Sequence, residues 1–231
     1  MSYSKKMTQV VTVATVAFLG SAVALSAQSA DGEMSFFITS DGGGDGANFG
    51  GLEGADAHCQ SLAEAAGSSR AWAAYLSTSM VIDRSSGSPE VTNGISARDR
   101  IGSGPWYNAA GVMIASDVDD LHSENVNITQ ATGLDENGNP INGRGSQPNE
   151  HDILTGSDSA GYFSTAGGDT TCGNWTSNGD GSAIVGHFDR VGLNSARNMT
   201  AWNSSHGSAG CGEADLPRTG GAGLLYCFAI D

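Results

Sequence analysis

The chain has 231 residues and is strongly acidic: ten Lys and Arg residues stand against 25 Asp and Glu residues, for a formal net charge of −15. Both lysines, Lys5 and Lys6, lie near the start, so the rest carries eight arginines and a net charge of 8 minus 25, or −17. Such a surface repels nucleic acid and anionic membranes, and we expect neither as a partner. The length is sufficient for one domain with a core of its own.

The first 27 residues have the pattern of a secretory signal peptide. A short positive region at Lys5 and Lys6 precedes an uncharged apolar run over residues 10–24, and small residues follow as far as Ala27. This run is too short for a comfortable membrane span and is typical of a cleaved signal, here of bacterial type. We therefore expect a flexible lead-in at residues 28–34 and one secreted, periplasmic or cell-surface domain at residues 35–231, without membrane insertion after cleavage.

The mature chain predicts a few regular elements separated by long loops. In chain order these are a strand at residues 36–39, a helix over 54–66, a buried strand at 72–76, a helical turn at 97–101, a hairpin-like pair at 105–107 and 112–114, and a last buried strand at 224–230. Small and apolar residues at helical spacing indicate the helix, which ends before Gly67. Residues 116–149 and the 34 glycines of the chain indicate extensive loops.

Four cysteines indicate two disulfides. They are Cys59 in the predicted helix, Cys172, Cys211, and Cys227 in the last predicted strand. An exported chain folds in an oxidising compartment, and none of the four forms a CxxC pair, so disulfides are favoured over a metal site. The count alone leaves three connectivities open.

The order of these elements resembles the C-type lectin-like fold, and several motifs are similar to a bacterial secreted, endostatin-like branch of it. Those motifs are Gly51–Cys59, Trp72–Ser79, Ala97–Gly102, Gly104–Asn108 and His151–Gly156, within a match from about Phe36 to Phe228. The resemblance implies an α+β domain with mixed antiparallel sheets, one main helix and a long irregular loop region. It also implies two nested disulfides, Cys59–Cys227 and Cys172–Cys211.

The resemblance further implies extracytoplasmic carbohydrate binding, assisted by calcium. Sugar-binding members place a Glu-Pro-Asn or Gln-Pro-Asp loop and a Trp-Asn-Asp strand around a calcium ion, which also takes sugar hydroxyls. The same order is seen here in Gln147-Pro148-Asn149-Glu150 and Trp202-Asn203. The expected ligand-binding residues are Gln147, Asn149, Glu150, Trp202 and Asn203, and the expected calcium ligands are Asn149, Glu150 and Asn203.

Two observations keep alternatives open at this motif. Ser204 stands where the second motif has Asp, so either calcium binds weakly, another acid supplies the charge, or there is no such site. Gln147-Pro148-Asn149 can equally be an ordinary turn, because Pro and Asn are common turn residues.

A second calcium loop is predicted at Asp135, Asn137 and Asn139. Pro140 excludes an EF-hand there and leaves an unliganded Asx turn as the alternative.

Other functions are weighed against the lectin hypothesis. The first alternative is an adhesin or matrix-interaction module that binds a cell-surface protein without calcium; a secreted hydrolase is the third. The five histidines (His58, His122, His151, His187 and His206) include no HExxH and no pair at three- or four-residue spacing. No GxSxG elbow, P-loop or dinucleotide fingerprint is present, so we expect no enzymatic activity.

The four tryptophans can belong to the core or stack on a sugar. We expect Trp72 and Trp106 in the core, and either role is possible for Trp175 and Trp202.

Overall fold

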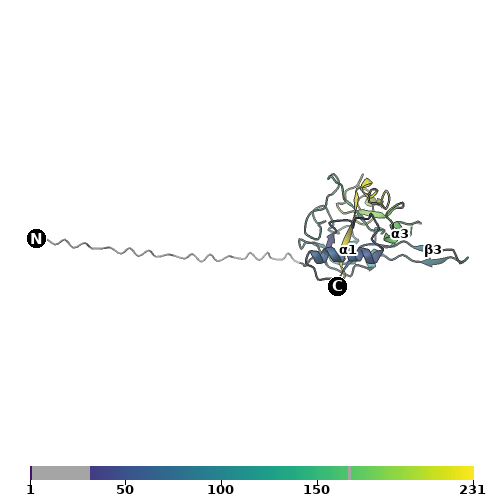
Figure 1. Cartoon of the computed structure of the whole chain (residues 1–231), viewed down its shortest axis with the longest axis horizontal. Helices are drawn as coiled ribbons and strands as arrows, with labels where there is room; N and C mark the ends of the chain where they lie inside the picture. Colours follow the sequence, from purple (N-terminus) through teal and green to yellow (C-terminus); the bar gives the residue numbers. More distant parts are fainter. Residues whose placement is uncertain (2–31, 166–167) are drawn as a thin grey trace.

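The computed structural model describes residue 1, residues 32–165 and residues 168–231. The predicted signal peptide and the start of the lead-in therefore lie outside the described residues. Within the described residues the chain is α+β, with few helices, several small β-sheets and two disulfides (Figure 1). No helix among them is long and apolar enough to cross a membrane.

The predicted main helix and most predicted strands are present. The helices and helical turns are α1 (Leu52–Ala65), η1 (Ala97–Asp99), α2 (Val118–Leu121), α3 (Cys172–Trp175), α4 (Arg197–Thr200) and η2 (Leu216–Arg218). The strands are β1 (Phe36–Ile38), β2 (Trp72–Ala74), β3 (Val81–Asp83), β4 (Glu90–Thr92), β5 (Trp106–Tyr107), β6 (Met113–Ala115), β7 (Asp152–Leu154), β8 (Ile184–His187), β9 (His206–Gly207) and β10 (Gly221–Ala229). Gly67 follows α1 with a φ of 92°, a conformation that favours glycine at a helix end.

The main sheet is built around the C-terminal strand. Its order is β1-β10-β7-β8-β9, and β2 also pairs with β10. The β10–β7 pair is parallel, and the other pairs of this sheet are antiparallel. Strand β10 is therefore central, as the apolar run at its end predicts.

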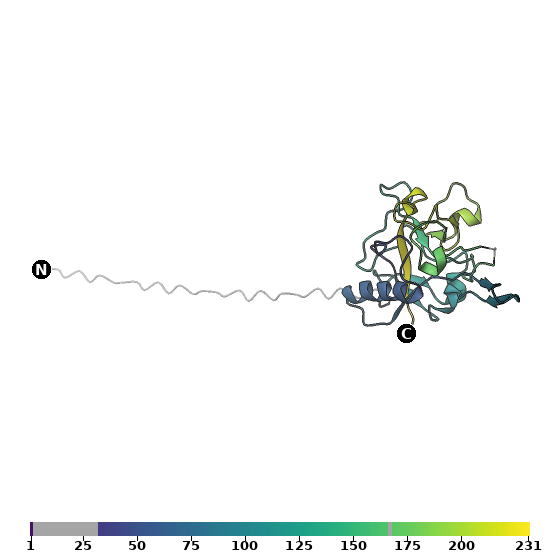
Figure 2. The same cartoon turned by 45° about the vertical axis from the view of Figure 1, so that its right-hand side comes forward.

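The two faces of this sheet carry separate cores because side chains alternate along β10. Tyr226 and Phe228 lie in one core with Trp106 and Trp202, and Leu225 and Cys227 lie in the other with Trp175. Helix α1 covers the second face through its buried Ala55, Cys59 and Ala63 (Figure 2). Both tryptophans whose place the sequence left open are thus core residues, 0% and 3% exposed for Trp175 and Trp202.

The disulfides join Cys59 to Cys227 and Cys172 to Cys211. The first bonds α1 to the central strand β10 and closes a sequence separation of 168 residues; the second closes 39. The nested pairing implied by the resemblance is therefore confirmed. In the chain-entropy model such loops restrict the unfolded chain by about 5 and about 4 kcal/mol before native strain is subtracted.

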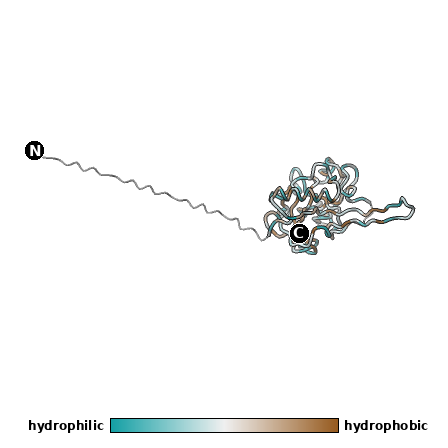
Figure 3. Tube along the Cα trace, turned by 60° about the horizontal axis from the view of Figure 1, so that its bottom comes forward, coloured by the Kyte–Doolittle hydropathy of each residue, from teal (hydrophilic) through white to brown (hydrophobic). Residues whose placement is uncertain are grey.

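A two-stranded arm projects from the domain and was not predicted. It consists of β3 and β4, paired antiparallel from Val81–Thr92 to Asp83–Glu90. Figures 1 and 3 show it extending away from the body, with an apolar stretch along it. All six strand residues are exposed, among them Val81, Ile82 and Val91. The arm therefore contributes little to either core.

Candidate metal centre

Three histidines and one aspartate come together where β7, β8 and β9 lie side by side. Asp152 begins β7, with His151 before it, and faces His187 at the end of β8 in the sheet register. His206 begins β9 and faces Val185, two residues before His187. Residues two apart on a strand point to the same face, so the pairing places the side chains of Asp152, His187 and His206 on one face.

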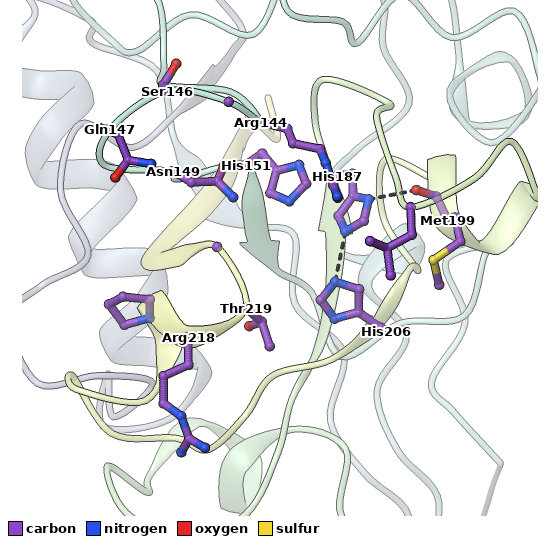
Figure 4. Close-up of a pocket in the computed structure, with 14 residues that line it drawn as sticks. Arg144, Ser146, Gln147, Asn149, His151, His187, Met199, His206, Arg218 and Thr219 are labelled. Atoms are coloured by element: carbon purple, nitrogen blue, oxygen red, sulfur yellow. Dashed lines mark hydrogen bonds between the residues drawn. The ribbon is translucent and has the colours of Figure 1, made fainter.

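The Nε2 atoms of the three histidines converge on one oxygen of Asp152. Oδ1 of Asp152 lies 3.2 Å from Nε2 of His151, 3.2 Å from that of His187 and 3.6 Å from that of His206. The Nε2 atoms of His187 and His206 are 2.9 Å apart, as the dashed line in Figure 4 marks. A zinc ion bonded to four ligands at 2.0–2.1 Å has ligand–ligand edges of about 3.3–3.4 Å. The four separations given above bracket that value. The ligand atoms of His151, Asp152 and His187 all lie within 4.8 Å of one another, and His206 adjoins this group through His187 and Asp152.

Each imidazole has an acceptor at its other ring nitrogen. Nδ1 of His151 is 3.2 Å from Oδ1 of Asp189, and Nδ1 of His187 is 2.7 Å from the carbonyl oxygen of Met199. Nδ1 of His206 is 3.0 Å from the carbonyl oxygen of Gly207. Carbonyl and carboxylate oxygens only accept, so each Nδ1–H donates and each neutral ring presents an Nε2 lone pair to the centre. This outer arrangement is typical of metal-binding histidines.

Asp189 supports the centre as a carboxylate. Burial alone raises the pKa of Asp189, but hydrogen bonds from His151 and from the backbone N–H groups of Arg144 and Val191 outweigh burial and lower the pKa below its usual value. The ionised Asp189 therefore fixes the orientation of the His151 ring and makes that ring a better electron-pair donor.

Asp152 is the residue of this group whose charge a nearby cation would stabilise most. It is 1% exposed, and neither of its carboxylate oxygens accepts a hydrogen bond from any described residue. A buried carboxylate that accepts no hydrogen bond is strongly disfavoured, whereas a divalent ion between it and the three imidazoles would compensate its charge. His151, Asp152 and His187 alone bring three candidate ligand atoms within 4.8 Å of one another.

Two glycines make this packing possible. A Cβ atom on Gly186 would lie 1.8 Å from the carbonyl oxygen of Trp202, so glycine lets the segment before β9 approach β8. Gly220 has a φ of 107°, and a Cβ there would lie 2.5 Å from Nδ2 of Asn149 and 3.0 Å from Cδ2 of His151. Both glycines therefore keep space for the chain around the centre.

No protein-family model and no curated protein matches the chain.

The three imidazoles lie at an open pocket of about 620 Å³, a size that suits a small ligand. His151, His187 and His206 line it, whereas the buried Asp152 does not (Figure 4). The remaining lining residues are Arg144, Gly145, Ser146, Gln147, Asn149, Leu193, Met199, Pro217, Arg218, Thr219 and Gly220. A metal ion bound by the four side chains would therefore lie at the base of a ligand-accessible cavity.

The structure brings only part of the predicted sugar site to this pocket. Gln147 and Asn149 line it, and Oδ1 of Asn149 is buried without a hydrogen-bond partner among the described residues. Glu150 instead accepts a hydrogen bond from Nδ2 of Asn142 at 2.9 Å. Asn203 donates to the hydroxyl of Tyr75 and the carbonyl oxygen of Asp158, 1% exposed in the interior.

These positions correct two expectations. Trp202 packs in the core against Tyr75 and Tyr226, and its indole N–H donates to the carbonyl oxygen of Leu121, so it offers no exposed ring to a sugar. The side chain of Asn203 is committed to the interior contacts above and does not join Asn149 and Glu150 in one ligand set.

The second predicted calcium loop is an Asx turn. The carboxylate of Asp135 accepts hydrogen bonds from the backbone N–H groups of Asn137 and Asn139 and from Nδ2 of Asn139, at 2.7–2.9 Å. Asp135 is 6% exposed, and its oxygens are satisfied within the turn. These contacts are those of the Asx turn that the sequence leaves as an alternative, and calcium binding by this loop stays a prediction.

Proposed function

We propose that this protein is an extracytoplasmic binding protein that holds a zinc-type divalent metal ion at the base of its pocket. The observation that carries the proposal is the convergence of three imidazole Nε2 atoms on the buried carboxylate of Asp152. That carboxylate accepts no hydrogen bond from the described residues. Each ring is already oriented by an acceptor at Nδ1. These are the features of a first and a second ligand shell.

The donor set favours zinc over calcium. Calcium takes six to eight oxygen ligands, whereas a donor set of imidazole nitrogens and one carboxylate oxygen suits Zn²⁺ and neighbouring first-row ions.

A carbohydrate is the second candidate for what the pocket binds. Two of the residues expected from the C-type lectin-like resemblance, Gln147 and Asn149, line the same pocket as the histidines. The nested disulfides and the central β10 are consistent with that fold. Retention on a glycan array that requires Zn²⁺ rather than Ca²⁺ would support this candidate, and no retention under either ion would contradict it.

Metal binding itself is tested by isothermal titration of the mature protein, after EDTA and dialysis, with Zn²⁺ and separately with Ca²⁺. We expect one Zn²⁺ per chain, and a loss of at least tenfold in affinity for His187→Ala and His206→Ala. His58→Ala is the matched control, because His58 lies on α1 beside Asp41 and outside the centre. Absence of stoichiometric Zn²⁺ binding, or equal loss in the control, would refute the proposal.

A further inference from the structure

Arg144 lines the pocket at the candidate metal centre, and its side chain forms no ion pair with the described residues. Six of the eight arginines form ion pairs with described carboxylates: Arg70, Arg98, Arg100, Arg190, Arg197 and Arg218. Arg84 and Arg144 form none with the described residues. Arg84 lies in the turn of the arm between β3 and β4, whereas Arg144 lines the pocket. In so acidic a chain an unpaired arginine beside a pocket suggests that its partner is the ligand.

The position of Arg144 is tied to the metal centre. Its backbone N–H donates to Oδ2 of Asp189 at 2.7 Å, while Oδ1 of the same carboxylate holds the ring of His151. Figure 4 shows the Arg144 side chain extending toward His187. Arg218 points away in that view and is bound to Asp215 at 3.0 Å. Arg144 is therefore the arginine available to a ligand at the metal.

The lining of the pocket differs in charge from the rest of this acidic protein. None of the described residues that line it is Asp or Glu, although the chain has 25 such residues. A divalent ion would balance the two carboxylates at the centre, Asp152 and Asp189, and the guanidinium of Arg144 would then leave the site with a net positive charge. A pocket of this sign attracts an anion, and its low-dielectric walls strengthen the attraction.

We propose that the pocket binds a small organic carboxylate, held between the Arg144 guanidinium and the metal ion; this rests on the metal-binding function proposed above. Guanidinium matches a carboxylate with two parallel hydrogen bonds, and zinc can expand to a fifth ligand. Leu193, Met199 and Pro217 provide an apolar wall for the body of such a ligand. Inorganic phosphate could pair with the same guanidinium, but it has no apolar part to contact these three side chains.

The test uses the mature protein loaded with Co²⁺, whose visible absorption reports ligands at the metal. Benzoate is titrated, with benzamide as a neutral probe of the same shape and inorganic phosphate as a second oxyanion. We expect benzoate to change the cobalt spectrum and to bind at least tenfold more tightly than benzamide or phosphate. Arg144→Gln should weaken benzoate binding about 10- to 100-fold, as loss of a charge-assisted interaction does. Arg84→Gln, the other unpaired arginine, should leave it unchanged.

The outcomes separate this proposal from metal binding. If Co²⁺ binds but benzoate does not, or if benzamide binds equally well, the carboxylate site is refuted and the metal site stands. Unchanged benzoate affinity in Arg144→Gln, with the variant's melting temperature preserved, also refutes it, as does preferred binding of phosphate. If no metal binds, the proposed function fails and the carboxylate site fails with it.

Discussion

Replacing Asp152 by Asn distinguishes a metal ligand from a partner in a buried ion pair. The carboxylate of Asp152 is buried and accepts no hydrogen bond from a described residue. The Asn side chain is nearly the same size, carries no charge, and can donate its N–H to an imidazole Nε2 atom about 3.2 Å away. We therefore expect Asp152→Asn to be at least as stable as the wild type in EDTA.

Added metal should reverse that order. At free Zn²⁺ 100 times its Kd, the wild type gains about 2.7 kcal/mol of unfolding free energy. For a domain of roughly 200 residues this corresponds to about 5–11 °C in Tm, at roughly 2–4 °C per kcal/mol. A 100-fold loss of affinity in the variant would leave it only about 0.4 kcal/mol of stabilisation at the same Zn²⁺ concentration.

The assay is thermal and urea unfolding of both proteins, each in EDTA and in buffered Zn²⁺. Asp83→Asn on the exposed arm is the matched control and should follow the wild type in both conditions. Destabilisation of Asp152→Asn by about 3–5 kcal/mol in EDTA, with no response of the wild type to Zn²⁺, would refute the reasoning. That pattern is what loss of one partner from a buried ion pair produces.

Three further predictions concern the supporting structure. Gly220→Ala should lower the free energy of unfolding by about 1–3 kcal/mol and weaken Zn²⁺ binding, because the φ of 107° disfavours a side chain and the added Cβ would crowd His151. Urea unfolding and Zn²⁺ titration check these two effects. Gly179→Ala is the control and should show neither effect, because the space around Gly179 is open. Burial raises the pKa of Tyr75 above its usual value, so the folded state holds the hydroxyl proton of Tyr75 more tightly than the unfolded state. The resulting contribution to the free energy of unfolding is complete below about pH 10 and is lost as pH rises further. Urea unfolding at pH 8 and pH 11 should therefore show a loss that is smaller in Tyr75→Phe, and an equal loss in both would contradict this. Ile82→Ser on the arm should change the unfolding free energy by less than about 0.5 kcal/mol, and a larger loss would show that the arm packs against the domain.

The elements that could be predicted have strong local signals. Cys59 recurs with Ala55 and Ala63 at helical spacing, and these three are the buried residues of α1. The apolar run ending in β10 is long enough to identify a buried strand, and residues 227–229 indeed pair with β2. The disulfide pairing came from resemblance to a family rather than from the spacing of the cysteines.

The candidate metal centre could not be predicted from the sequence, because its side chains are brought together by strand pairing. His187 and His206 lie in strands of four and two residues, too short to show an alternating pattern. A search for histidines at local spacing excludes sites of this kind, since the three rings come from separate strands. Two signals were present: His151-Asp152 at the start of a predicted strand, and Gly186-His187-Phe188-Asp189, which supplies both a ligand and its supporting carboxylate.

The distribution of the four ligands over three strands determines when a metal ion can be acquired. In an unfolded chain His151, His187 and His206 are held together only by long flexible segments, so their joint affinity for a metal ion is low. The centre forms only when β7, β8 and β9 pair. If the chain folds only after export, it would leave the cytoplasm without a metal ion at the proposed centre. The ion would then be chosen by the supply outside the cell membrane rather than by the cytoplasmic pool.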